Sequence, residues 1–523
     1  MKIRITIAFN LLVFIQLFGQ ENIPLANEIG NSWVEHLNKL DVGFHTSVRP
    51  YLATEFNATR PVSCFSGTKN HFWNAGLQWK PNDSDSTFPK HGFYVQPHFR
   101  AILQSDIAND TSYFGRGLGA GITYTNRNKF AANFSFVTDN SPYPEYLRPS
   151  ISAGNAIPGM GFAHPTNEGY AITAVSGYAS WSPHKIFNFQ VGSGKHFFGD
   201  GYRSLLISDN AYNYPYLRMS ATFWQIKYVV LYSMMNDLGT SQGDPKQFRR
   251  KYATTHFLNW NISRRFSLGI FETVVWQAKD SLLNRQFDVN YLNPFVFFRP
   301  VEYAQGSADN VLMGLNAKLK ITDHYQVYGQ FILDEFLLNE MRADSGWWAN
   351  KYGFQLGAKL FSPFGLKNLY LQTEYNFVRP FTYSHRSVVQ NWGHMGSPLA
   401  HPFGANFREW INIARFTYKR FQFEETFMWT IYGLDTGSVS WGGDPFKSYS
   451  QRARNYHNHV GQGQRNEVLF HQFRISWIVS PTWNSRVFIG HQYRKQQTDL
   501  GMNETHMLVF GLSSWLWNQY TDR

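Results

Sequence analysis

The sequence predicts an all-β protein, a transmembrane antiparallel up-and-down β-barrel of about 18 strands. Composition gives the first indication: aromatic residues make up 18% of the 523 residues and charged residues only 16%, below the quarter that is usual in soluble domains. Several segments alternate apolar and polar residues with the period of a strand. Short turns and long polar connections also alternate along the chain, as they do in outer-membrane barrels.

The first 19 residues have the pattern of a secretory signal peptide that is removed on export. Lys2 and Arg4 form a short basic region, residues 5–18 are largely apolar, and Gly19 is a small residue of the kind that precedes a cleavage site. The apolar stretch is short for an uncleaved membrane anchor. Because Cys64 is the only cysteine, an intramolecular disulfide is excluded.

Residues 20–92 are expected to form an N-terminal periplasmic segment that is partly helical and partly irregular. Leu25, Ile29, Trp33 and Leu37 recur at helical spacing and predict one amphipathic helix. The residues after this helix are mixed and rich in Asn, Ser and Pro. The sequence leaves open whether the segment is an extension of the barrel or a plug-like element.

Residues 93–523 are expected to form the outer-membrane barrel. The alternation of apolar and polar residues is clearest at 130–136, 187–191, 325–333 and 369–377. A soluble sandwich would bury the apolar side in a core, whereas a membrane barrel turns it to lipid and lines the lumen with the polar side. The connections favour the barrel, because short turns largely alternate with long polar loops, which cover 140–168, 199–215, 237–250, 280–310, 337–349, 379–407 and 434–465. This pattern puts both termini on the periplasmic side.

The chain is basic, with a formal net charge of +12 that falls to +10 when Lys2 and Arg4 leave with the signal peptide. A basic protein at the cell surface favours anionic partners such as acidic polysaccharide or lipopolysaccharide phosphate. Export argues against nucleic acid as a partner. Basic residues also fall in predicted turns, namely Arg127, Arg264, Arg265, Lys419 and Arg420. A solvated surface without a particular partner is the alternative.

The sequence contains no recognisable catalytic motif, so we expect a protein that is not an enzyme and has no cofactor. It lacks HExxH, a phosphate-binding loop and a paired-cysteine metal site, and we expect no metal. Gly115, Gly117, Gly119 and Gly121 lie within a strand pattern, where close backbone packing explains them better than a phosphate site. A Ser–His–Asp esterase stays an open alternative, because such triads are defined by geometry and not by sequence position.

Chemically distinctive residues concentrate between Gly192 and Arg218, in the run GSGKHFFGDGYRSLLISDNAYNYPYLR. Glycine, aspartate, asparagine and proline predict turns here, and the run also combines aromatic rings with charged side chains. Aromatic faces stack on sugar rings while carboxylates, amides and guanidinium groups bind sugar hydroxyls, so a carbohydrate site is one interpretation. The other is a structural loop folded against the mouth of the barrel.

The part of this run from His196 to Arg218 resembles the hallmark of the capsule-assembly outer-membrane proteins, the Wzi-like family, and is closest to their gliding-motility, RemB-like branch. The resemblance extends over the barrel from about Phe93, including GLSSWLWNQY, and the early segment Phe44–Tyr51 is similar as well. It implies a barrel of about 18 strands with periplasmic helices, acting as a lectin that holds capsular polysaccharide at the cell surface. The helical N-terminus is shorter and less regular here than the family implies.

The resemblance, with one adjacent lysine, supplies the candidate residues for binding polysaccharide or shaping the loop. They are Gly194, Lys195, His196, Phe197, Gly199, Asp200, Gly201, Tyr202, Arg203, Ser208, Asp209, Asn210, Tyr214 and Pro215. Further sugar contacts are expected from external loops that carry Trp347, Trp348, Trp392 and Trp441. In the last of these loops His457 and His459 suit a metal or an anion, or simply a solvated loop.

These observations predict an outer-membrane surface protein that binds or anchors capsular or extracellular polysaccharide, in capsule assembly or in gliding-related adhesion. The expected partners are that polysaccharide, which the basic charge allows to be anionic, outer-membrane lipid and lipopolysaccharide, and the barrel assembly machinery. The alternative is a porin-like channel or another outer-membrane transport component, because a wide barrel with a polar lumen could conduct solutes. Long loops that fold inward would oppose an open pore.

Overall fold

The computed structural model describes residues 20–57, 91–126, 129–149, 151, 156–239, 241, 243–279, 285–294, 309–480 and 483–522. The predicted signal peptide and residues 58–90 of the predicted N-terminal segment lie outside the described residues, as do Cys64 and Arg127. No helix in the described part of the chain is long and apolar enough to cross a membrane.

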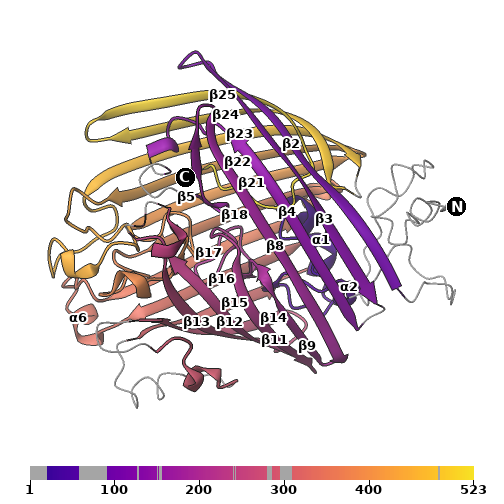
Figure 1. The fold of residues 1–523 in the computed structure, drawn as a ribbon, viewed down its shortest axis with the longest axis horizontal. Coiled ribbons are helices and arrows are strands. Elements are labelled where there is room, and N and C mark those ends of the chain that lie inside the picture. The colour runs from indigo at the N-terminus through magenta and orange to yellow at the C-terminus, as the bar shows by residue number, and fades with distance from the viewer. Residues whose placement is uncertain are drawn as a thin grey trace, which may run out of the picture.

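Eighteen long antiparallel strands in the described ranges close into a barrel, which confirms the predicted fold class and strand number (Figure 1). Each long strand pairs with the next one along the chain, and β2 pairs with β25, so that Arg100 lies opposite Ser513. Because the barrel is closed, each of these described long strands has a neighbour on both sides along at least part of its length. The strands are β2 (His91–Asp106), β3 (Thr111–Asn126), β4 (Phe130–Ser141), β8 (Gly169–His184), β9 (Phe187–Gly194), β11 (Tyr214–Phe223), β12 (Ile226–Asp237), β13 (Arg249–Trp260), β14 (Phe266–Gln277), β15 (Asn310–Lys320), β16 (Tyr325–Glu335), β17 (Lys351–Phe361), β18 (Leu369–Val378), β21 (Phe407–Tyr418), β22 (Phe421–Leu434), β23 (Gln464–Ser480), β24 (Ser485–Thr498) and β25 (Gly501–Ser513).

Short elements lie in the loops, in the lumen and at one edge of the wall. Three short antiparallel pairs form from β1 (Val48–Arg49) with β10 (Phe197–Phe198), β5 (Ala156–Ile157) with β6 (Gly161–Phe162), and β19 (Gly393–His394) with β20 (Ser397–Pro398), and β7 (His164–Thr166) extends the wall beside β8. The α-helices are α1 (Asn27–Asn38), α2 (Ala53–Asn57) and α6 (Leu338–Arg342), and single 3-10 turns occur at Pro245–Gln247, Val289–Leu292, Pro363–Gly365, Val388–Gln390 and Tyr449–Gln451. Helix α1 lies where the spacing of apolar residues predicts a helix.

The two faces of the wall follow the period-two alternation of the sequence. On β3 the outward side chains Phe114 and Leu118 are 55% and 67% exposed, whereas the inward positions between them are glycines. A Cβ atom at Gly117 would lie 2.9 Å from the ring of Trp515 and 2.7 Å from an oxygen of Asp139. These glycines therefore serve close packing inside the barrel, as predicted. A continuous exposed apolar band on a closed wall is the surface that a barrel presents to lipid.

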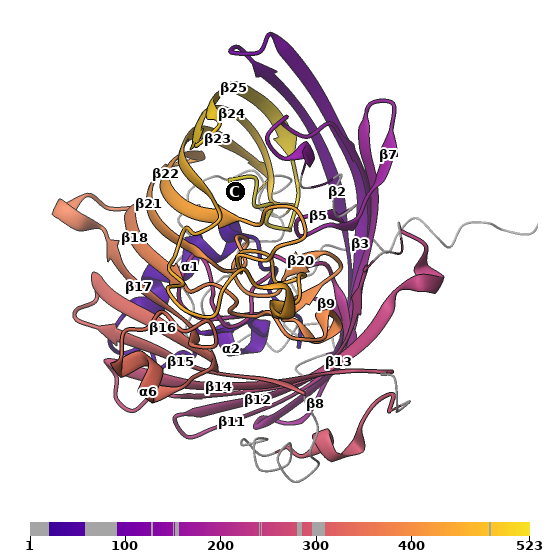
Figure 2. The same cartoon turned by 90° about the vertical axis from the view of Figure 1, so that its left-hand side faces the viewer.

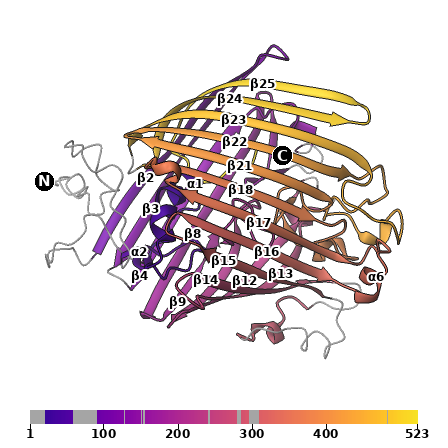
Figure 3. The ribbon, with the colours of Figure 1, turned by 180° about the vertical axis from the view of Figure 1, so that it is seen from behind.

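The two ends of the barrel differ in the length of their connections. Helices α1 and α2 lie near the short turns, while α6 and the long loops gather at the opposite end (Figure 3). In the view turned by 90°, which looks into the barrel, chain segments are seen within the lumen (Figure 2). A large apolar cluster lies within the barrel, formed by lumen segments and inward-facing wall residues; it includes Val48, Phe198, Leu205, Leu206, Ile207, Phe257, Tyr383 and Trp392.

Candidate functional site

Residues 195–213 join β9 to β11 and fill the middle of the lumen; they are called the lumen loop below. Strand β9 has 8 residues and β11 has 10, whereas the preceding strand β8 has 16. Because β9 and β11 are short, the loop leaves the wall partway along the barrel and turns inward. It is buried almost throughout, and its central residues Leu205–Ile207 are fully buried.

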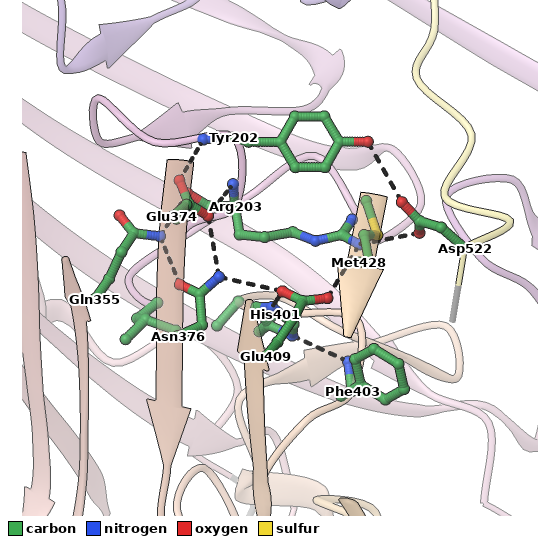
Figure 4. Close-up of polar contacts among 12 residues, drawn as sticks. Tyr202, Arg203, Gln355, Glu374, Asn376, His401, Phe403, Glu409, Met428 and Asp522 are labelled. Atoms are coloured by element: carbon green, nitrogen blue, oxygen red, sulfur yellow. Dashed lines mark hydrogen bonds and ion pairs between the residues drawn. The ribbon is translucent and has the colours of Figure 1, made fainter. Parts of the chain in front are cut away.

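Arg203 is the centre of a buried ionic network that joins the lumen loop to the far wall (Figure 4). Its Nη2 atom lies 3.0 Å from Oδ1 of Asp522 and 3.5 Å from Oε1 of Glu409. The backbone N–H groups of Tyr202 and Arg203 donate to the carboxylate of Glu374, at 2.7 and 3.0 Å. Burial would lower the pKa of Arg203, but Asp522 and Glu409 raise it well above its usual value. A charge buried in this way is tolerated only because it is paired and hydrogen-bonded.

The acceptors of this network are held by neighbouring strands. Glu409 on β21 accepts a hydrogen bond from Nδ2 of Asn376 on β18, at 3.1 Å, and its Oε2 lies 2.7 Å from Nε2 of His401. Asn376 also donates to Glu374 on its own strand, at 3.0 Å. Two carboxylates on adjacent strands are therefore oriented toward one loop. This fixes the position of the guanidinium group of Arg203 in the lumen.

Asp200 forms a second junction, between the lumen loop, the wall and the N-terminal segment. Its carboxylate accepts from Nδ2 of Asn316, at 3.0 Å, and from the hydroxyl of Thr46, while Nζ of Lys318 lies 3.9 Å away. Nζ of Lys359 donates to the backbone carbonyl of Asp200. Burial would raise the pKa of Asp200, but Lys318 and Lys359 lower it below its usual value. The residue is therefore a fixed anion.

Asp209 connects the lumen loop to the residues that follow β25. Its carboxylate accepts from the hydroxyl of Tyr520 and from Nδ2 of Asn518, both at 2.7 Å. The neighbouring Ser208 and Asn210 donate to backbone carbonyls of the long loop at 379–406. Residues 514–522 thus run back into the lumen and take part in its closure.

The remaining predicted site residues mostly have packing contacts. His196 is buried, with Nδ1 3.1 Å from the hydroxyl of Tyr214, and the guanidinium of Arg49 lies 3.7 Å from the ring centroid of Phe197. Lys195 is half-buried, donates to the carbonyls of Gly159 and Asp209, and has its pKa lowered to about 8 by burial. A Cβ atom at Gly199 or Gly201 would collide with wall side chains, Gly194 is half-buried, and Pro215 is exposed. The structure therefore brings these residues together as parts of a closed loop, and sugar contact by them stays a prediction.

The described part of the N-terminal segment contacts the inner wall in the short-turn half of the lumen. Nζ of Lys320 donates to the backbone carbonyls of Leu37, Lys39 and Val42, at 3.0, 3.0 and 2.9 Å. These carbonyls stand at and beyond the C-terminus of α1, where a cation is favoured because the last carbonyls have no helical partner. Lys227 pairs with Glu55 at 2.5 Å. Residues 20–57 are thus anchored to the inner wall, in the arrangement of a plug.

At the long-loop end, aromatic and basic side chains form a cluster called the mouth platform: Trp347, Trp348, Tyr449, Arg452 and Tyr456. The ring centroids of Trp348 and Tyr449 lie 4.7 Å apart, and those of Trp347 and Tyr456 lie 4.9 Å apart. The guanidinium of Arg452 lies 4.3 Å from the centroid of Trp348. All five side chains keep some exposure, and Tyr456 is 44% exposed. Partly exposed aromatic rings beside a guanidinium group can contact sugar rings and bind their hydroxyls.

Backbone hydrogen bonds between two long loops build this platform. The N–H of Trp348 donates to the carbonyl of Asn455, and the N–H groups of His457 and Asn458 donate to the carbonyls of Ser345 and Gly346, each at 2.9 Å. Among the described residues no group of three His, Cys, Asp or Glu side chains could hold a metal ion.

Two of the tryptophans predicted to bind sugar have other surroundings. Trp392 is fully buried, and its Nε1 donates to the carbonyl of Leu206 at 2.7 Å. The prediction that Trp392 contacts sugar from an external loop is therefore wrong; the residue holds the lumen loop in place. Trp441 is half-buried, 5.6 Å below the guanidinium of Arg454.

Sequence reasoning missed several residues of the lumen network. Glu374 and Glu409 lie on the polar side of their strands, which the alternation identifies, but alternation does not show what an inward carboxylate contacts. Tyr520 and Asp522 follow β25, and the sequence pattern assigned them no role in the lumen. The largely polar run NQYTD after Trp517 is the signal that could have separated them from the strand.

Comparisons with known proteins support the fold. No protein-family model and no curated protein sequence matches the chain. Among solved structures it is similar to Wzi, an outer membrane protein involved in group 1 capsule assembly in Escherichia coli and a carbohydrate-binding β-barrel, with 14% identity, a TM-score of 0.52, and coverage of 81% of this chain and 84% of that chain. It is also similar to the outer membrane protein OprD from Pseudomonas aeruginosa, with 11% identity, a TM-score of 0.41, and coverage of 82% and 96%. The first likeness shows the Wzi-like barrel fold, without support for the gliding-motility branch, and the second is too general to bear on function.

Proposed function

We propose that the protein is an outer-membrane surface barrel with a closed lumen that binds or anchors capsular or extracellular polysaccharide. The observation that carries this proposal is the mouth platform, an accessible cluster of aromatic rings and a guanidinium group above a lumen that the chain itself fills. Wzi, which has the same fold at low identity, is described as a carbohydrate-binding barrel in capsule assembly, and this supports the choice of ligand.

The long-loop end suits a polymer better than a small solute. Two long loops hold Trp347, Trp348 and Tyr456 at the surface, and a platform open to one side can take a repeating chain without enclosing an end. Basic and acidic side chains occur in similar numbers in the described external loops. The surroundings of the platform therefore fit neutral as well as anionic glycans, in contrast to the basic charge of the chain as a whole.

A porin-like channel is the second candidate, because the fold itself permits one. The lumen loop opposes it, since buried ion pairs connect this loop to β15, to β21 and to the residues that follow β25. Lipopolysaccharide contact, delivery by the barrel assembly machinery and a gliding-related role remain parts of the proposal that glycan binding alone does not address.

Binding of the folded barrel to the surface polysaccharide purified from the producing cell tests this function. We expect saturable binding that Trp348→Ala weakens by about tenfold, as for a buried aromatic contact at the centre of an interface. The matched control is Trp224→Ala, since Trp224 is exposed at the opposite end of the barrel. Absence of binding by a folded wild-type barrel, or equal loss in both variants, would contradict the proposal; a large steady conductance in planar bilayers would favour the channel.

A further inference from the structure

The short turns form a rim at one end of the barrel, and the charged side chains of this rim are mostly basic. Its described basic side chains are Lys129, Lys185, Arg264, Arg265, Lys367, Lys419 and Arg420. Asp323 is the acidic residue among the described residues of these turns. The opposite end of the barrel carries both signs in similar numbers, so the basic character predicted from the sequence is concentrated at the rim and in the lumen. Of these two groups of basic residues, those of the rim are the exposed ones.

Several of these basic side chains are available to a ligand. Lys129, Lys185, Arg264, Lys367 and Lys419 are all exposed, and none of them forms an ion pair with another described residue. Uncompensated cations around one end of a barrel attract an anionic surface.

The same turns present apolar side chains to the solvent. Phe364, Trp224, Tyr418 and Leu366 are 85%, 76%, 56% and 54% exposed. Phe364 has φ of 60°, a left-handed conformation that is unfavourable for a bulky residue. In water, an exposed ring in a strained turn gains no stabilisation. At a membrane interface it does, because aromatic rings are stabilised at the level of the lipid headgroups.

The rim also stands at the height where lipid headgroups are expected. An exposed aromatic belt lies on the outer wall just inside the turns, formed by Trp181, Phe187, Phe223, Trp260, Tyr325, Phe416, Phe421 and Trp477. Such belts mark the boundary between hydrocarbon and headgroups. The basic turns directly beyond the belt are therefore level with the phosphates of the adjoining leaflet.

We propose that this rim binds the headgroups of anionic phospholipids in the leaflet on its own side of the membrane. Lysine and arginine side chains pair with the phosphates, and Phe364, Trp224 and Tyr418 enter the interface between them. In outer-membrane barrels the short turns face the periplasm, so this is the inner leaflet. The site is separate from the mouth platform and would seat the barrel in the membrane whatever the mouth binds.

Lipid selectivity measures this binding directly. The full-length barrel is reconstituted in vesicles of equal parts phosphatidylcholine and phosphatidylglycerol and extracted with its adjoining lipid. We expect phosphatidylglycerol to be enriched over phosphatidylcholine by about threefold, and to lose this enrichment at high salt, because exposed charges are screened. The combined variant Lys185→Gln, Arg264→Gln, Lys367→Gln and Lys419→Gln should bring the ratio close to that of the vesicle.

A matched variant removes the same charge from the exposed external loops: Lys246→Gln, Lys279→Gln, Arg342→Gln and Arg386→Gln. It should keep the enrichment. No enrichment in the wild type, or equal loss in both variants, would overturn the proposal. If the rim variant fails to fold, the salt dependence of the wild-type enrichment still decides: a ratio that is independent of salt contradicts binding by exposed cations.

Discussion

The lumen loop and the mouth platform are both built from loops of the same barrel, and they use similar side chains in opposite ways. In the lumen loop Arg203 is 1% exposed and its guanidinium pairs with carboxylates. In the mouth platform Arg452 covers the ring of Trp348 and keeps part of its surface in solvent. In the first arrangement the guanidinium group is buried and paired with internal carboxylates, whereas in the second the rings and the guanidinium group keep part of their surface for an external partner.

This difference indicates where recognition and closure lie. The run that resembles a family hallmark is largely buried, and its side chains pack and pair inside the lumen. The platform is defined by two loops that contain no recognisable motif. In this chain the distinctive run therefore fills the lumen, and we place the ligand contacts in the less distinctive external loops.

Arg203→Ala gives the largest expected effect, because it removes the buried cation at the centre of the lumen network and leaves the mouth platform unchanged. The change leaves the buried carboxylates of Glu409 and Asp522 without their cation, and removal of one partner of a buried pair costs about 3–5 kcal/mol. The lumen loop should loosen while the strands stay paired. In planar bilayers the variant should conduct ions where the wild type does not. A silent variant whose loop remains protected from hydrogen exchange would contradict the role of Arg203.

Acidification should loosen the N-terminal part of the plug and spare the platform. His45 is buried, with Nδ1 2.6 Å from Oδ1 of Asn259, and burial lowers its pKa from 6.5 to about 4. The unfolded segment therefore binds the proton more readily, so stability is complete above a pH of about 6.5 and is lost as the pH falls toward 4, by about 2 kcal/mol near pH 5. Hydrogen exchange of residues 44–52 at neutral and acidic pH measures this loss.

The matched variant for that experiment is His45→Gln, which keeps a polar side chain and cannot titrate in this range. Its opening free energy should be the same at both pH values after correction for intrinsic exchange. A pH dependence as large as that of the wild type would assign the effect to another group.

Gly346→Ala should damage the platform and spare the lumen. Gly346 has φ of 62°, and a Cβ atom there would lie 2.7 Å from Cα of His457 in the facing loop. We expect a cost of about 1–3 kcal/mol from this backbone conformation and collision, with weaker polysaccharide binding and unchanged conductance. The control is Gly365→Ala, where φ is 73° but nothing lies within 4 Å of the added atom. Equal loss of binding in both variants would show that loop contact is not the cause.

Arg116→Ala should have the smallest effect and serves as the reference against which the other variants are compared. Arg116 pairs with Glu168 at 3.2 Å, but the two side chains are 63% and 66% exposed. Exposed pairs of this kind contribute about 0–1 kcal/mol. We expect conductance and polysaccharide binding like those of the wild type. A large change in either would indicate that the charges of this exposed pair matter more than the geometry of the mouth platform.

The architecture could be predicted from the sequence because it depends on local patterns. Period-two alternation and the spacing of turns determine which residues form strands, and the strand count follows from them. The glycines at 115–121 were also interpreted correctly, since their place in a strand pattern leaves close packing as their role.

The interior could not be predicted in the same way, because its contacts join residues far apart in the chain. Arg203 lies 206 positions from Glu409, and Asn518 lies 309 positions from Asp209. No local pattern reports such pairs. Trp392 was misplaced for the same reason: a long polar loop predicts exposure on average, and its inward turn depends on a partner, Leu206, in a distant loop.

The most direct test of the account is hydrogen exchange of the wild-type barrel with and without the purified surface polysaccharide. The account predicts slower exchange in residues 345–350 and 447–458, which form the platform, and no change in residues 195–213, which are already buried. Protection confined to residues 195–213, with the platform unaffected, would place the ligand in the lumen and contradict the division between closure and recognition.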